Sequence, residues 1–274
     1  MRGGGDLASG VIYRLYQAGF PVIVLELAAP LLVRRGACYG EAVFSGKATV
    51  AGIVARKVDS LEGVQAALLA GEIPVAVDEG GSMLESLEPS VLVDARMEKR
   101  PLDTVMSAAP LVISLGPGFT AGEHTHAVVE TNRGHDLGRV IWQGAAEPDT
   151  GTPGTVKGKQ HSRVLRAPAD GALVAHAQIG DRLAAGQTIA TVDGQPIVAA
   201  FNGVLRGLVH EKVRVWKGLK IGDLDPRGDV AACYTISDKA LAVGGGVVEA
   251  VMSADVIRQL IGEGQEGHEA TRSI

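Results

Sequence analysis

The sequence predicts an α/β protein: a parallel-sheet domain, then a small all-β module and a C-terminal helix. Short apolar runs alternate with helical or loop segments in the N-terminal half, which is typical of a parallel sheet. A Gly-rich turn stands directly before the first helical segment. Beyond residue 160 the segments become short, β-branched and punctuated by Gly, and they contain an internal repeat, which indicates a separate β module.

The composition favours a soluble cytoplasmic protein. The chain of 274 residues is long enough for about two domains, and 46% of it is hydrophobic, so a large core is available. The net charge is −5 with no basic block, which argues against nucleic-acid binding. We find no signal peptide and no apolar run long enough to span a membrane. Cys38 and Cys233 form no CxxC motif and are expected to stay reduced.

The N-terminal turn fits a dinucleotide-binding pattern. Gly3, Gly5 and Ala8 match G-x-G-x-x-[GA], in which small residues allow a tight turn, close approach of pyrophosphate and close helix packing. The following helix N-terminus, which includes Asp6, offers free N–H groups to an anion. Glu26 ends the next strand-like run, where an acidic side chain would accept hydrogen bonds from a ribose. The turn therefore predicts a Rossmann-like domain.

One part of that motif is missing from the sequence. A Rossmann turn follows an apolar strand, and only Met1 and Arg2 precede Gly3. Without that strand, its neighbours would keep unpaired backbone groups, at about 1–3 kcal/mol for each buried group. We therefore expect either that the true start lies upstream or that the sheet is incomplete. An upstream extension would then restore a β-branched run and raise stability.

Polar residues follow the expected strands 73–77, 91–94 and 111–115 at one edge of the sheet. Ligands of such sheets bind beyond the carboxyl ends of the strands. Asp78, Asp94 and the turn from Gly116 to Gly118 stand at this edge. Asp94 and Arg96 are candidate ligand contacts, and a surface ion pair is the alternative for them.

The segment 114–154 is a long polar loop rich in Gly and His. Such a loop in a compact domain is usually functional or disordered, and its apolar anchors favour an ordered functional loop over a plain connector. His126 can act as an acid or base near neutral pH, and Arg133 and Arg139 can pair with phosphate. The candidate catalytic residues are His126, Glu130 and His135. The candidate ligand-binding residues are Gly3, Gly5, Asp6, Ala8, Glu26, Gly116, Gly118, Arg133 and Arg139.

The β module carries a repeat with an offset of 32 residues (171 to 203). Gly171-Ala-Leu173 recurs as Gly203-Val-Leu205, and the turn at Gly186 recurs at Gly218. The stretch APADGALVAHAQIGDRLAAGQTIATVDG resembles the first half of a biotinyl/lipoyl-type barrel-sandwich hybrid. Carrier domains of that kind hold their group on a hairpin Lys, whereas the hairpin at 193–196 has none. We therefore expect no covalent biotin or lipoate, and interpret the module as a lid or docking domain.

The last part of the chain is predicted to be helical over 238–261. Gly244, Gly245 and Gly246 interrupt it, and each costs about 1 kcal/mol in a helix interior. We expect a break or a ligand-facing loop there, with a second strand–Gly–helix turn as the alternative. The expected divisions are a Rossmann-like domain (1–155), the barrel-sandwich β module (160–228), a helical segment (229–262) and a frayed tail (263–274).

Motifs along nearly the whole chain resemble the YqeB family of accessory proteins for selenium-dependent molybdenum hydroxylases. They are RGGGDLASGV, IPVAVD, VLVDARMEKR, SLGPGF, HAVVETNRGHDLGRVIWQG, TGTPG, RVLRAPADG, GVLRGL and KIGDLDPRG. The resemblance implies a role in maturing a molybdenum enzyme through its cofactor or selenium ligand, without implying a chemical step. Two departures are the absent first strand and His124, where the family more usually has an acidic residue. His126 is therefore the stronger candidate.

We accordingly predict a maturation factor that binds a dinucleotide or molybdopterin-type ligand, with hydroxylase subunits as partners. Whether it is an enzyme, and whether it forms a homo-oligomer, stays open. One alternative is an NAD(P)-dependent oxidoreductase, although no Tyr-x-x-x-Lys motif supports it. Another is a metal site built from His124, His126, Glu130 and His135. The last is a non-enzymatic docking scaffold that uses the β module.

Overall fold

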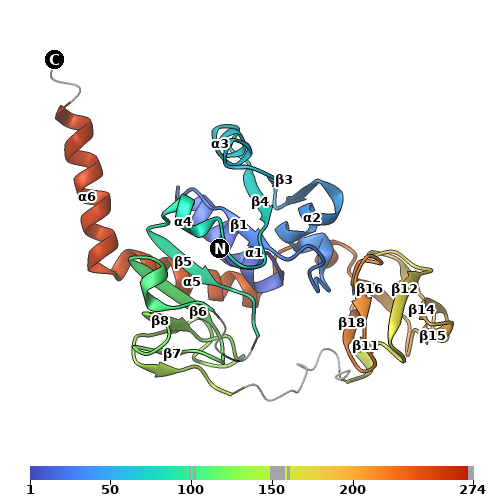
Figure 1. Cartoon of the computed structure of the whole chain (residues 1–274). Coiled ribbons are helices and arrows are strands. Elements are labelled where there is room, and N and C mark those ends of the chain that lie inside the picture. Colours follow the sequence, from blue (N-terminus) through green and yellow to red (C-terminus); the bar gives the residue numbers. More distant parts are fainter. Residues whose placement is uncertain (99, 101–102, 149–157, 159–160, 271–274) are drawn as a thin grey trace.

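The computed structural model describes residues 1–98, 100, 103–148, 158 and 161–270 (Figure 1). The protein is mixed α/β, with several sheets and a C-terminal helix. An α/β body carries the first helices and the long sheet, the β module lies to one side, and the last helix projects from the body (Figure 1). The last part of the expected loop 114–154, with its TGTPG motif, and the domain boundary at 155 lie outside the described residues.

The body is built on a long, mostly parallel sheet in two halves that share one short central segment. One half has the order β1-β4-β3-β2 and the other β5-β6-β8-β9. Their strands are β1 (Val24–Glu26), β2 (Lys47–Val50), β3 (Ile53–Val58), β4 (Ile73–Val77), β5 (Val91–Asp94), β6 (Leu111–Leu115), β8 (Ala127–Val129) and β9 (Val140–Ile141). A separate two-stranded ribbon pairs β7 (Thr120–Ala121) with β10 (Gly144–Ala145).

Residues Met1 to Gly3 fill the position between β1 and β5. Arg2 forms parallel bridges to both Leu25 and Asp94. The Arg2 N–H donates to the Val93 carbonyl at 2.8 Å, and the Gly3 N–H donates to the Leu25 carbonyl at 2.8 Å. The expectation of an interrupted sheet is therefore wrong for this chain. Met1 to Gly3 can fill this position because the strands on either side, β1 and β5, are themselves short.

Two helices cross on one face of this sheet, α1 (Asp6–Gln17) and α5 (Asp238–Ser253). A Cβ added at Gly10 would lie 2.1 Å from the Ala240 carbonyl oxygen, and one at Gly244 would lie 2.4 Å from the Gly10 oxygen. A Cβ at Gly246 would lie 2.0 Å from the oxygen of Gly138, in the loop after β8. The predicted break at Gly244–Gly246 is wrong, since α5 is continuous. Gly244 and Gly246 let backbones touch, and this packing outweighs their low helix propensity.

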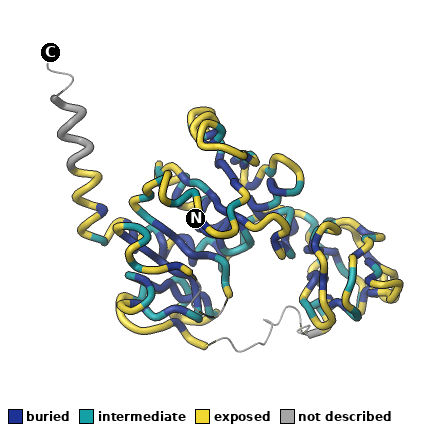
Figure 2. Tube along the Cα trace, in the orientation of Figure 1, coloured by how far each residue is buried: buried dark blue, intermediate teal, exposed yellow. Residues whose placement is uncertain are grey.

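The remaining helices are shorter or peripheral: α2 (Ala42–Ser45), α3 (Leu61–Leu69), α4 (Leu84–Leu87) and α6 (Asp255–Ala270). Ser60 caps α3 by accepting from the Gly63 N–H, and the helix buries Val64 against Val58. The helix α6 continues through Ala270, into the segment 263–274 for which we expected a frayed tail. Its described surface is largely exposed (Figure 2).

The β module has its own buried core between two four-stranded sheets, β11-β18-β16-β13 and β15-β14-β12-β17. Its strands are β11 (Val164–Arg166), β12 (Gly171–Ala175), β13 (Arg182–Leu183), β14 (Thr188–Val192), β15 (Gln195–Val198), β16 (Gly203–Leu208), β17 (Arg214–Val215) and β18 (Lys220–Asp225). The two copies of the repeat exchange strands, since β12 pairs with β17 and β16 with β13. The repeated apolar positions Leu173 and Leu205 are both buried.

The hairpin of the module turns at Asp193 and Gly194, between β14 and β15. Both residues have positive φ, 49° and 72°, which is the conformation of the tightest two-residue hairpin turn. Gly186 and Gly218 also have positive φ, 84° and 85°, at the matching turns of the repeat. The turn residues that define the repeat in sequence are therefore the residues whose backbone requires Gly.

Within the part of the chain that the structure describes, no single helix is long and apolar enough to cross a membrane. One pair of helical segments, Ala231–Ser253 and Asp255–Gly262, passes that test only when taken together, and it is bent by 68°.

Neighbouring glycines of α5 should respond in opposite directions to the same substitution. Gly246→Ala places a Cβ against the Gly138 backbone and should destabilise the protein by about 1–3 kcal/mol through overpacking. Gly245→Ala meets no atom within 4 Å and should stabilise it by about 0.5–1 kcal/mol through helix propensity. Urea unfolding of both variants checks this, and equal effects at the two positions would contradict the packing described here.

Candidate functional site

The Gly-rich turn is fixed by its neighbours at the carboxyl edge of the sheet. Gly3 has a φ of +95°, and a Cβ there would lie 3.2 Å from the Ala95 carbonyl oxygen. Gly5 is the N-cap of α1, and no side chain caps the helix there. Gly4 packs against Gly40, whose N–H donates to the Gly4 carbonyl at 2.9 Å. The turn is therefore rigid before any ligand binds.

Glu26 lies beside this turn, as predicted, but its carboxylate already holds the protein's own amides. One oxygen accepts from the Gly4 N–H at 2.7 Å, and the other accepts from the Leu27 N–H at 2.8 Å. Burial raises the pKa of Glu26, and the two backbone hydrogen bonds oppose that shift. In this structure the Glu26 carboxylate holds the backbone of the Gly turn in place. A ribose hydroxyl would have to bind a carboxylate oxygen that already accepts a backbone N–H.

Asp94 and Arg96 lie in a buried ion-pair network next to the turn, and the alternative of a surface ion pair does not describe them. Arg96 donates to Asp94 at 2.6 Å, and the Thr104 hydroxyl donates to the same carboxylate at 2.7 Å. Arg2 reaches Thr104 at 3.2 Å and Asp103 at 2.8 Å. Arg2 is 3% exposed and Asp94 2%, so the network fixes the carboxyl ends of the central strands.

The predicted turn Gly116–Gly118 lies on the same edge. Both glycines have positive φ, +66° and +117°. A Cβ at Gly116 would lie 2.5 Å from the Thr131 hydroxyl and 3.2 Å from the end of Met97. Because Met97 follows Ala95, which packs on Gly3, the two Gly-rich turns belong to one continuous surface.

Glu130 is buried and organises the loop after β8. One oxygen accepts from the Thr131 and Asn132 N–H groups, each at 2.6 Å, and the other accepts from the Glu147 N–H at 2.7 Å. Only 2% of Glu130 is exposed. The geometry makes Glu130 a positioning residue, in contrast to the catalytic role that we predicted for it.

His126 does not lie beside the Gly turn. His126 precedes β8 and is tied to Val112 near the start of β6, since its Nδ1 accepts the Val112 N–H at 2.9 Å. It therefore lies at the amino edge of the sheet, about 13 Å from Glu130 along the strand. Burial lowers its pKa. His135 lies exposed in the loop before β9. The position of His126 at the amino edge separates it from the Gly turn, and the catalytic roles of His126 and His135 stay predictions.

The structure does not arrange the residues of the alternative metal site around a common point. The Nδ1 atom of His124 accepts the Thr120 N–H at 3.0 Å, so the rings of His124 and His126 are each committed to a separate backbone group. Among the described residues, no group of three or more His, Cys, Asp or Glu side chains is arranged to hold a metal ion.

The two predicted arginines have different surroundings. Arg133 pairs with Asp238 at the start of α5 through two hydrogen bonds of 3.0 and 3.1 Å. The Asp238 hydrogen bond raises the pKa of Arg133, and the Asp6 carboxylate acts in the same direction while Arg227 opposes it. Arg133, Asp6 and Arg227 therefore share one electrostatic neighbourhood. Arg139 pairs with Asp136 within its own loop.

Arg34 is a functional candidate that sequence reasoning missed. Its guanidinium pairs with Asp6 at 2.7 Å and donates to the Ala232 and Thr235 carbonyls at 3.0 and 2.9 Å. Arg206 of the β module shares the Ala232 carbonyl at 3.4 Å. Burial, followed by the nearby Arg34 charge, lowers the pKa of Arg206. Crowding of guanidinium groups beside a helix N-terminus is a signal that only the fold reveals.

Lowering the pH should remove the contribution that Asp103 makes to the stability of the folded protein. Its hydrogen bond with Arg2, helped by Arg96, lowers the pKa of Asp103 from 3.8 to about 2. A depressed carboxyl pKa stabilises the folded state above pH 3.8, and this contribution is lost as the pH falls towards 2. Wild type should exceed Asp103→Asn in stability at pH 7 by less than about 1 kcal/mol, because Asp103 is half exposed. The two melting curves should converge between pH 4 and pH 2. A constant difference over that range would show that ionisation of Asp103 does not stabilise the edge.

No family model matches the chain. A solved structure of an aspartoacylase family protein from Mesorhizobium loti covers 78% of this chain and 59% of its own, with a TM-score of 0.24 and 10% identity. That likeness is too distant to support an argument. The chain is 47% identical over 252 residues to "Uncharacterized protein YqeB" of Escherichia coli (strain K12), over 92% of this chain and 47% of the relative. The chain is similar in sequence to that protein and spans about half of its length.

Proposed function

We propose that the protein is a maturation factor for a selenium-dependent molybdenum hydroxylase, and that it binds a nucleotide-like or molybdopterin-type ligand at the carboxyl edge of its sheet. The observation that supports a ligand site at this edge is the order of the strands in the sheet. Residues 1–3 lie between β1 and β5, and the sequence β4-β1-(1–3)-β5-β6-β8 runs outward in both directions from this segment. In open α/β sheets of the Rossmann kind, ligands bind where the order reverses in this way.

Three backbone segments meet at this reversal. The Gly3–Asp6 turn packs on Ala95, and Met97 packs on Gly116. None of these contacts leaves room for a side chain at Gly3 or Gly116, so the chain approaches this edge with bare backbone. Backbone N–H groups beside a helix N-terminus are suited to a phosphate or another anion.

The charges around the edge fit a ligand that carries phosphate. The N-terminus of α1 is the positive end of the helix dipole, which stabilises a bound anion by about 0.3–1 kcal/mol. Arg34 pairs with Asp6, and the Asp6 charge also acts on Arg133, while Arg34 keeps a buried Nε without a partner within the described residues. A phosphate that displaced Asp6 from Arg34 would gain charge-assisted hydrogen bonds.

The β module would then act as a lid or docking surface at this site. Arg206 from β16 lies near Arg34, and both donate to the Ala232 carbonyl. The absence of a Lys at the hairpin agrees with a module that contacts a ligand or partner without carrying a covalent group. The hydroxylase partner is the part of this proposal that rests on the family resemblance.

Comparing substitutions of Arg133 and Arg139 tests the proposed ligand site directly. Calorimetry with ADP and with molybdopterin cytosine dinucleotide should detect binding to the wild type. Arg133→Ala should weaken it about tenfold, because one charge-assisted contact near Asp6 is lost and Asp238 is left unpaired. Arg139→Ala is the matched control, since Arg139 is similarly exposed and pairs only with Asp136 in its own loop.

Loss of affinity in both variants to the same degree would indicate a diffuse charge effect and reject this site. If neither ligand binds to the wild type, the proposed ligand class is wrong. Co-purification of the full chain with a tagged hydroxylase subunit tests the partner separately, and an absent complex in the presence of saturating ligand would argue against the maturation role.

A further inference from the structure

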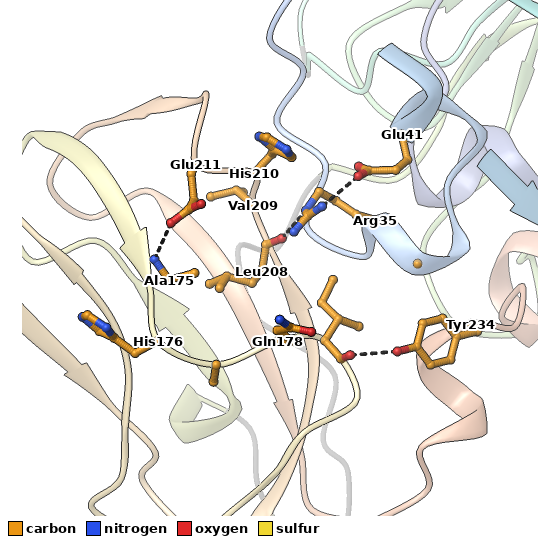
Figure 3. A pocket seen from close by; sticks show the side chains of 13 residues that line it. Arg35, Glu41, Ala175, His176, Gln178, Leu208, Val209, His210, Glu211 and Tyr234 are labelled. Atoms are coloured by element: carbon orange, nitrogen blue, oxygen red, sulfur yellow. Dashed lines mark hydrogen bonds and ion pairs between the residues drawn. The ribbon is translucent and has the colours of Figure 1, made fainter. Parts of the chain in front are cut away.

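A cavity that the Gly turn does not line lies between the β module and the segment that follows β1 (Figure 3). Its volume is about 530 Å³, within the range of small-molecule pockets. Arg35 and Glu41 contribute one wall and His210 and Glu211 the other, with Gln178 and Tyr234 at the lower side (Figure 3). None of the residues predicted from the sequence lines this cavity.

Hydrogen bonds fix the walls of the cavity before any ligand enters. Arg35 donates to the Leu208 carbonyl and to Glu41, both at 2.8 Å. Tyr234 donates to the Ile179 carbonyl at 2.7 Å. Because these bonds join the body to the β module, the cavity is a built feature of their contact, and binding there would cost little reorganisation.

His210 offers the cavity a flat and rigid surface. Phe44 stacks on its ring at 4.2 Å with an interplanar angle of 7°, and Phe44 is not among the residues that line the cavity. The Nδ1 atom accepts the Lys212 N–H at 3.1 Å, which leaves the proton of the neutral ring on Nε2. Burial and the Arg35 charge lower the pKa of His210, so this ring is neutral near pH 7.

Polar groups in the wall are available at the cavity's edge. Within the described residues, the second terminal nitrogen of Arg35 and the side-chain amide of Gln178 have no hydrogen-bond partner, so both can donate. Glu211 uses one oxygen for the Ala175 N–H at 2.8 Å and keeps the other as an acceptor. The lining holds one cation, Arg35, against the two carboxylates Glu41 and Glu211. This balance disfavours a phosphate group.

From these observations we infer that this cavity binds an uncharged planar nitrogen heterocycle of nucleobase size, stacked on His210 and hydrogen-bonded at its rim by Arg35, Gln178 and Glu211. The site is distinct from the proposed phosphate site at the Gly turn. A ligand without phosphate would therefore occupy it independently of Arg133.

Nucleosides are suitable probes because they carry the flat ring without phosphate. Titration of the full chain with adenosine, guanosine and cytidine, followed by calorimetry, should show saturable binding of at least one of them, whereas ribose should not bind. His210→Leu should weaken the binding about tenfold by removing the stacking surface. Gln178→Ala should weaken it about threefold. Gln195→Ala, an exposed glutamine of β15 outside the cavity, is the matched control and should leave the affinity unchanged.

Circular dichroism melts of each variant establish that the fold is retained, and Gln178→Ala keeps the test valid if His210→Leu does not fold. The inference is overturned if no nucleoside binds, or if ribose binds equally well. It is also overturned if folded Gln178→Ala and His210→Leu bind like the wild type. Nucleoside binding that is lost in Arg133→Ala would place the heterocycle at the Gly turn instead, whereas failure of ADP alone to bind would count only against the proposed function.

Discussion

The close approach of α1 and α5 is the constraint on which the rest of the body depends. Gly10 and Gly244 let the two helix backbones touch, and Gly246 lets the loop after β8 rest on α5 through Gly138. Any side chain at Gly10, Gly244 or Gly246 would overlap backbone atoms, which cannot move aside as a flexible side chain can. This contact seats both helices on the sheet and holds the loop that carries Arg133 next to the first turn of α5.

The same contact decides what the polar loop can do. While Gly138 contacts α5, Glu130 accepts the N–H groups of Thr131 and Asn132 beside it and of Glu147, which follows β10. Its carboxylate therefore shapes the backbone. The exposed Arg133 then pairs with Asp238 at the start of α5, while Arg139 pairs with Asp136. The functional potential of the loop lies in one arginine, because the buried acid fixes the path of the chain around it.

Local patterns predicted the parts of the structure that depend on local backbone chemistry. The Gly turn before α1 and the repeat of the β module were both predicted from residue spacing, because positive φ at Gly186 and Gly218 and buried apolar pairs leave a regular trace in sequence. The three glycines of α5 were misinterpreted as a break, because propensity says nothing about a partner helix more than two hundred residues away.

The site was only partly predictable for a related reason. Glu26 and the Gly116–Gly118 turn follow strands directly, so their place at the carboxyl edge follows from the alternation of the chain. His126 and Glu130 lie at opposite ends of β8, a strand of three residues, and loop composition could not separate them. Arg34 and Arg206 were missed because their common partner, the Ala232 carbonyl, is distant from both in the sequence.

Two consecutive arginines connect the body to the β module. One lies at the Gly turn and the other lines the cavity. Arg34 turns towards the Gly turn, where it holds Asp6, and Arg35 turns towards the cavity, where it holds Glu41. Each also binds a backbone carbonyl across the contact, Ala232 for Arg34 and Leu208 for Arg35. Because Arg34 and Arg35 are neighbours in the chain, the backbone segment between β1 and β2 positions both guanidinium groups. Because Gly40, a few residues later, lies against Gly4, a shift of this segment would reach the Gly turn through backbone contacts.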